Sequence, residues 1–118
     1  MTSIETARLI AKALDNKKGA DIKILKIDDL TVIADYFVIA TGNSNTQVKA
    51  LAGEAEYLLE NEANIRPLRV EGYDSGGWIL IDFNTVIVHV FQPSAREFYS
   101  LERLWADAEE IDTDFLND

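Results

Sequence analysis

The chain has 118 residues, 47% of them hydrophobic, with one histidine and no cysteine, so disulfides and thiolate metal sites are excluded. Its 11 basic and 21 acidic residues give a formal charge of -10, which disfavours direct binding to DNA because such affinity comes largely from neutralised phosphates. The length predicts one domain, and the lack of a leader-like start or a long apolar run predicts a cytoplasmic protein without a membrane span.

The first thirty residues predict a helix followed by a strand. Thr2 and Glu5 have the spacing of a helix-capping box, and apolar residues then recur every three or four positions until Gly19, which favours a helix end. Residues 21–27 alternate in polarity, but the apolar positions change parity at Leu25. This change predicts a strand with a β-bulge.

The next segment predicts a buried strand, a crossover helix and another strand. Residues 36–41 are apolar on both parities, as in a central strand that helices cover on both faces. Ser44 and Gln47 repeat the capping-box spacing, and the helix that they begin ends before Pro67. We expect residues 68–71 to form a strand parallel to residues 36–41, joined to it by a right-handed crossover.

The C-terminal half predicts a hairpin and a last helix. Residues 78–83 and 86–91 are apolar strands separated by Asn84 and Thr85, so we expect an antiparallel pair. Pro93 suits the first turn of a helix. The apolar residues that follow it at helical spacing are Phe98, Leu101, Leu104 and Trp105.

The predicted order of elements, α-β-β-α-β-β-β-α, indicates an α/β fold in which helices flank a mixed sheet. We expect this single domain to cover residues 1–105. In the remaining segment, residues 106–118, six of thirteen residues are acidic, and only Ile111, Phe115 and Leu116 could pack. We therefore expect residues 106–118 to be an acidic, loosely ordered tail.

Five stretches of the sequence carry a family resemblance. They are Asp-Tyr-Phe-Val-Ile-Ala-Thr-Gly-Asn-Ser at 35–44, Gly-Trp-Ile-Leu-Ile-Asp-Phe at 77–83, Val-His-Val-Phe at 88–91, Arg-Glu-Phe-Tyr at 96–99 and Leu-Glu-Arg-Leu-Trp at 101–105. In their order and spacing they resemble the ribosomal silencing factor family, RsfS, also called the Iojap family. The similarity extends from the first helix to Trp105.

The resemblance implies a fold shaped like a nucleotidyltransferase but without its catalytic carboxylates, in a protein that is not an enzyme and has no cofactor. It implies binding to the large ribosomal subunit through a basic ribosomal protein, number fourteen of that subunit, on the face that meets the small subunit. Docking there would sterically block subunit joining and repress translation. Free members of the family are commonly homodimers, so a homodimer is expected.

The turn formed by Gly42, Asn43 and Ser44 leaves a second interpretation open, a nucleotidyltransferase-related enzyme or nucleotide-binding protein that holds phosphates on backbone N–H groups. Such an enzyme needs paired carboxylates for its metal ions, but the candidate strands offer Glu71 and Asp82 only as isolated acids. A strand that enters a helix needs the same permissive turn and N-cap without any ligand. A homodimeric scaffold for another basic protein is a third interpretation. We predict no catalytic, cofactor-binding or metal-binding residue.

The candidate partner-binding residues lie on the predicted hairpin and last helix. Trp78 follows two glycines and shares parity with Leu80 and Asp82, and aromatic anchors beside a carboxylate suit a protein interface. Asp82 would pair with a basic side chain or an N–H group of the partner. His89 has either a packing role or a partner contact. The full predicted set is Trp78, Ile79, Leu80, Asp82, His89, Arg96, Tyr99 and Leu101.

Overall fold

The structure is a computed structural model that describes residues 1–117. Its elements, in chain order, are α1 (Ser3–Asn16), β1 (Ala20–Lys26), β2 (Tyr36–Thr41), α2 (Asn45–Ala63), β3 (Arg69–Glu71), β4 (Trp78–Asp82), β5 (Val86–Phe91), α3 (Pro93–Tyr99), α4 (Leu101–Leu104), β6 (Glu109–Ile111) and the 3₁₀ turn η1 (Asp114–Asn117). The strands form a six-stranded sheet in the order β3-β4-β5-β2-β1-β6. β2 and β5 are parallel, and the other neighbouring pairs are antiparallel. The predicted α/β class, with a mixed sheet flanked by helices, is confirmed.

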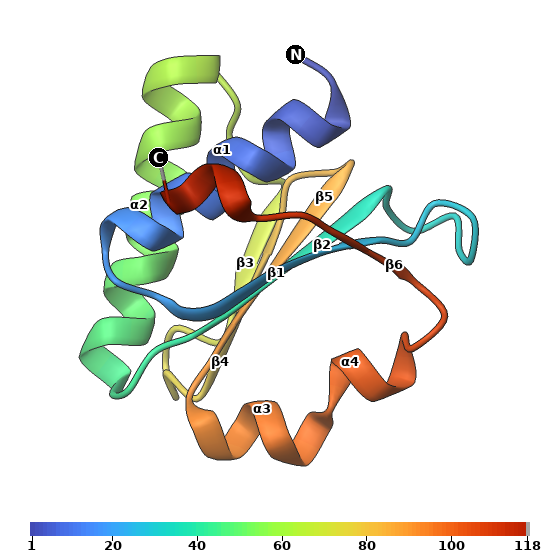
Figure 1. The fold of residues 1–118 in the computed structure, drawn as a ribbon. Coiled ribbons are helices and arrows are strands. Elements are labelled where there is room, and N and C mark those ends of the chain that lie inside the picture. The colour runs from blue at the N-terminus through green and yellow to red at the C-terminus, as the bar shows by residue number, and fades with distance from the viewer. Residues whose placement is uncertain (118) are drawn as a thin grey trace.

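Helices cover both faces of the sheet (Figure 1). α1, α2 and η1 lie on one face, and α3 and α4 lie on the other. On β4, Ile79 and Ile81 pack on the α1/α2 side, whereas Trp78 and Leu80 pack on the α3/α4 side, because successive side chains of a strand face opposite ways. The larger apolar core therefore lies beneath α1 and α2, and a smaller one lies beneath α3 and α4.

The predictions for the N-terminal elements are confirmed. The hydroxyl of Thr2 accepts a hydrogen bond from the N–H of Glu5, and the Glu5 carboxylate accepts one from the N–H of Thr2, so the capping box of α1 is complete. The register of β1 against β2 shifts between Ala20 and Lys23, which is the irregularity expected in this strand. β2 is an interior strand between β1 and β5.

The crossover through α2 leads to a more distant strand than expected. β3 runs in the same direction as β2, but it lies at the edge of the sheet, with β5 and β4 between them. All six residues of β5 are buried, whereas two of the three residues of β3 are exposed. The strand that is apolar on both faces therefore takes the interior place beside β2, and the predicted β4–β5 hairpin is confirmed.

The last helix is interrupted, so the prediction of one continuous helix is wrong. α3 ends at Tyr99. The next residue, Ser100, has a left-handed backbone with φ of 47°, and the short α4 follows it. Leu101, the first residue of α4, is buried, but Phe98 and Leu104 are exposed. A continuous helix would place these three residues on one buried face. The break at Ser100 gives α3 and α4 different directions, so only Leu101 is buried.

The expectation of a loosely ordered tail after residue 105 is also wrong for the described residues. Residues 109–111 form β6, which pairs with β1 and places Ile111 opposite Ile24. Figure 1 shows this strand beside β1 and the η1 turn close to α1. Phe115 and Leu116 pack against the larger core. The few apolar residues of this acidic segment are enough to anchor it, and the predicted order of elements gains α4, β6 and η1.

Candidate partner-binding surface

One face of β4 is only partly covered. Trp78, Leu80 and Asp82 lie on that face at alternate positions, and each is half-buried. Tyr99, at the end of α3, continues the surface, and its ring centroid lies 4.6 Å from that of Trp78. We call Trp78, Leu80, Asp82 and Tyr99 the β4 surface. It joins exposed aromatic and aliphatic area to a carboxylate, a composition found at protein–protein contacts.

An aromatic cluster supports and extends the β4 surface. The ring of Trp78 lies 4.9 Å from that of Phe91, which is fully buried. On the outer side, Phe98 makes an edge-to-face contact with Tyr99 at 5.1 Å and is 81% exposed. Helical periodicity indicated that Phe98 belonged to the core, so sequence reasoning missed it as a surface residue. An exposed phenylalanine next to Tyr99 enlarges the apolar area available to a partner.

His89 holds Trp78 in place from below. The indole Nε1–H of Trp78 donates a hydrogen bond to His89 Nδ1 over 3.1 Å. His89 is 4% exposed, and its burial lowers its pKa to about 4. The neutral ring accepts at Nδ1 and therefore carries its proton on Nε2, which has no hydrogen-bond partner among the described residues. His89 thus orients the indole of Trp78 and is itself covered.

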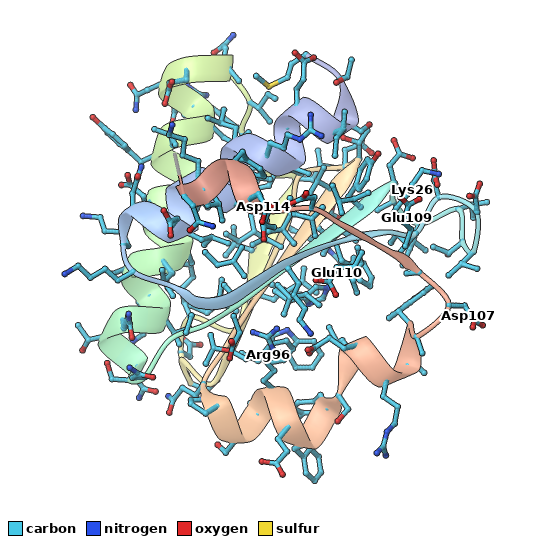
Figure 2. The ribbon with its side chains drawn as sticks, viewed as in Figure 1. Lys26, Arg96, Asp107, Glu109, Glu110 and Asp114 are labelled. Atoms are coloured by element: carbon cyan, nitrogen blue, oxygen red, sulfur yellow. The ribbon has the colours of Figure 1, made fainter. Side chains whose placement is uncertain are left out.

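Arg96 braces α3 and α4 against the end of β2. Its Nη1 donates to Thr41 Oγ1 over 2.8 Å, and its Nε donates to Glu102 Oε1 over 3.1 Å. Figure 2 shows Arg96 pointing from α3 toward the sheet. Burial opposes ionisation of Glu102, but hydrogen bonds and charge from Arg96 and Lys23 keep the pKa of Glu102 below its usual value. The side chain of Arg96 is only 11% exposed, so its main contacts are internal.

The structure gathers seven of the eight predicted residues on the α3/α4 side. Trp78, Leu80, Asp82 and Tyr99 reach the surface, and His89, Arg96 and Leu101 lie in the layer that supports it. Ile79 does not belong to this group. It is fully buried in the larger core on the opposite face, because its parity on β4 differs from that of Trp78. Including Ile79 among exposed partner-binding residues is therefore wrong.

Two charged residues of β3 join the β4 surface through the strand register. Arg69 lies opposite Asp82, and Glu71 lies opposite Leu80. Arg69 Nε is 3.6 Å from Asp82 Oδ2, and Arg69 Nη1 is 3.8 Å from Glu71 Oε1. Both ion pairs are long and share the 60% exposed Arg69, so they contribute little to stability. No sequence pattern marked Arg69 as a site residue, and Glu71 was considered only as an isolated acid, because the register of β3 on β4 could not be read from the chain.

Comparisons with known proteins decide the family. The whole chain, residues 1–118, matches the family described as ribosomal silencing factor during starvation, RsfS. The chain belongs to the RsfS family. It is 41% identical over 108 residues to the ribosomal silencing factor RsfS of Bacillus subtilis, covering 92% of this chain and 91% of that one. The RsfS of Halalkalibacterium halodurans is 39% identical over 112 residues, with 95% of each chain covered.

A solved structure agrees with the RsfS assignment. The crystal structure of a protein from Chromobacterium violaceum matches with a TM-score of 0.86 and 40% identity, over 90% of this chain and 88% of that one. RsfS proteins are regulators associated with ribosomes and translation, and the family is not known for an enzymatic activity. Within the described residues, none of the helices has the length and apolar character that crossing a membrane requires.

A hollow in this RsfS chain lies away from the β4 surface. It has a volume of about 490 Å³ and lies at the end of β2, where Thr41, Asn43, Pro93 and Arg96 are among its lining residues. The chain leaves β2 toward α2 on one face and β5 toward α3 on the other, and ligands of α/β proteins bind at such points. The N–H of Asn43, however, already donates to the side chain of Gln47.

Proposed function

We propose that this chain is a ribosomal silencing factor that binds the large ribosomal subunit through the β4 surface. Its target there is ribosomal protein number fourteen of the large subunit. The docked chain occupies space that the small subunit must enter, so it blocks subunit joining and represses translation. The observation that carries the proposal is the β4 surface itself, a half-buried aromatic and aliphatic patch beside a carboxylate, in a chain whose relatives are named ribosomal silencing factors.

The charge of the chain supports a basic protein as the partner. A formal charge of -10 attracts basic surfaces at long range and raises the encounter rate. Acidic side chains also line the β6 end of the sheet, where Figure 2 labels Asp107, Glu109 and Glu110. These residues lie at the edge opposite β3. They contribute to attraction, whereas the β4 surface supplies the close apolar contact that gives affinity and specificity.

The proposed mechanism is steric and involves no bond making or breaking. The fraction of large subunits that cannot join equals the fraction that carries the docked chain. Regulation therefore follows from the abundance of the chain and its affinity for the subunit. We also propose that the free protein is a cytoplasmic homodimer, as the family resemblance implies. Light scattering of the free protein and of its subunit-bound form would test the homodimer.

Substitutions on the β4 surface test the proposal. Trp78→Ala removes the central ring, and Asp82→Lys reverses the neighbouring charge, so each should weaken co-sedimentation with purified large subunits by at least about tenfold. Tyr57→Ala is the matched control, because Tyr57 is a 63% exposed aromatic residue on α2. Circular dichroism melts would show that the variants remain folded. Undiminished binding by both β4-surface variants would contradict the choice of surface.

Subunit joining is measured separately from binding. Excess wild-type protein should lower the joined-ribosome peak of a lysate gradient, and the protein should migrate with the large subunit. Trp78→Ala at the same concentration should leave that peak unchanged. A wild-type protein that binds large subunits but leaves joining unaffected would contradict the steric mechanism and preserve the binding proposal.

The position of the hollow at the end of β2 is the observation behind a second candidate function, nucleotide binding. Its position between Thr41 and Pro93 is the place where α/β proteins bind ligands. The carboxylates of Asp21, Glu97 and Glu102 line this hollow, together with the guanidinium groups of Arg96 and Arg103. Because the carboxylates outnumber the guanidinium groups, the charge opposes a phosphate-bearing ligand. We expect no rise in melting temperature with nucleotide and Mg²⁺, and a concentration-dependent rise would establish binding.

A further inference from the structure

A small cleft lies beside Trp78, between the end of β3 and the start of β4. It has a volume of about 160 Å³ and is lined by Glu71, Gly72, Trp78 and Leu80. Gly72 adopts φ of 97°, and a Cβ on this residue would lie 2.0 Å from the carbonyl oxygen of Trp78. Only glycine fits this close approach, so backbone forms part of the wall. The result is a cleft with apolar side-chain walls and one carboxylate.

The charges around the cleft favour a cation. Glu71 and Asp82 face the same side of the sheet as Leu80, and Arg69 lies between their carboxylates at 3.8 Å and 3.6 Å. The formal charges of these three side chains sum to -1. Arg69 is 60% exposed, and both of its ion pairs are longer than a direct hydrogen bond. An incoming cation can therefore reach Glu71 without breaking a strong internal contact.

We propose that this cleft binds a lysine or arginine side chain of the protein partner. The aliphatic stem of that side chain would cover Trp78 and Leu80, and its charged end would bond to the Glu71 carboxylate. The inference rests on the proposed function, because it adds a specificity contact to the β4 surface. A purely apolar side chain would cover Glu71 without giving it a partner, and a phosphate of ribosomal RNA would be repelled by it.

Two substitutions with opposite expected effects test the proposal. Glu71→Gln keeps the shape of the side chain but removes its charge, and it should weaken binding to purified large subunits about tenfold. Arg69→Gln removes the competing internal cation and should strengthen the same binding about threefold. Glu62→Gln, at an exposed acid on α2, is the matched control and should leave the affinity unchanged. Melting temperatures would show that all three variants fold.

The outcomes separate this inference from the proposed function. If wild-type protein does not bind large subunits, both are overturned. If Trp78→Ala abolishes binding while Glu71→Gln and Arg69→Gln behave like Glu62→Gln, the β4 surface stands and the cleft contact is overturned. If the two effects have inverted signs, the cleft faces RNA phosphate and the inference is wrong. Weaker binding by Glu71→Gln together with tighter binding by Arg69→Gln supports a basic side chain in the cleft.

Discussion

The two faces of the sheet are built from alternate residues of the same strands, but they carry different chemistry. On the α1/α2 side, β4 and β5 contribute Ile79, Ile81, Val88 and Val90, and all four are fully buried. On the α3/α4 side, the residues between them include a tryptophan, an aspartate and His89, and part of this face remains exposed. One face is committed to the core, and the other combines a smaller core with an exposed surface.

The difference indicates how a chain of this size separates stability from recognition. The larger core joins both long helices to the sheet through buried aliphatic side chains and Phe83. The opposite side uses polar contacts for position, since His89 orients Trp78 and Arg96 fixes α3 and α4 to Thr41. Substitutions on the first face should therefore change the free energy of unfolding. Substitutions on the exposed part of the second face should change binding.

The sharpest test compares neighbouring residues of β4 that face opposite ways. Ile81→Ala should lower the free energy of unfolding by about 2 to 5 kcal/mol, because it removes three carbons from a fully buried position. Leu80→Ala, at a half-buried position, should lower it by about 1 kcal/mol or less. Urea unfolding followed by circular dichroism measures both values.

Binding should show the reverse order. Leu80→Ala should weaken co-sedimentation with large subunits, whereas Ile81→Ala should retain it at temperatures where the variant is folded. Equal losses of stability in the two variants would show that the faces are not divided between these roles. A folded Ile81→Ala variant that has lost binding would lead to the same conclusion.

The second prediction concerns His89, the buried titratable group on the recognition side. Burial lowers its pKa from an ordinary 6.5 to about 4, so the unfolded chain takes up a proton at higher pH than the folded chain does. Its stabilising effect is present in full above the unfolded pKa and is lost as the pH falls toward the folded pKa. Acidification from about pH 7 to about pH 5 should cost the wild type about 2 kcal/mol through this residue.

A variant without the imidazole isolates that contribution. In His89→Asn, the free energy of unfolding should fall less between the same two pH values, because the carboxylates titrate alike in both proteins. The intrinsic fluorescence of Trp78 should also change in the variant at neutral pH, since the indole loses its acceptor. Parallel pH profiles for the two proteins would contradict the assignment of a neutral, buried His89.

Local patterns predicted the elements whose signals are short-range. The capping box of Thr2 and Glu5, the shift in β1, the buried β2 and the antiparallel hairpin were each predicted from neighbouring residues and are confirmed. The family could also be predicted, because several motifs occur in order along the chain. Parity on β4 correctly grouped Trp78, Leu80 and Asp82 on one face.

Long-range pairing explains what the sequence could not predict. Ile111 is anchored opposite Ile24 because β1 has an edge with which β6 can pair. β6 has only three residues, two of them acidic, so the sequence does not indicate a strand there. The left-handed Ser100 lies in a pattern that is helical on both sides. Likewise, Arg69 and Glu71 join the site only through the register of β3 on β4. The alternation of side chains along β4 that groups Trp78 with Leu80 places Ile79 on the opposite face, so Ile79 should not have been among the predicted partner-binding residues.

The third prediction concerns Arg96, which holds α3 and α4 against the end of β2. Arg96→Ala removes hydrogen bonds to Thr41 and Glu102, and it should lower the free energy of unfolding by about 1 to 2 kcal/mol. Amide exchange should accelerate in residues 93–104 more than in β5, because the lost contacts are those that fix the two helices. Arg103→Ala, at an exposed position on α4, is the matched control and should change neither quantity.

A uniform acceleration across the sheet would show that the two helices unfold only with the whole molecule. In that case α3 and α4 would contribute to global stability as α1 and α2 do, and only the β4 surface would be reserved for recognition.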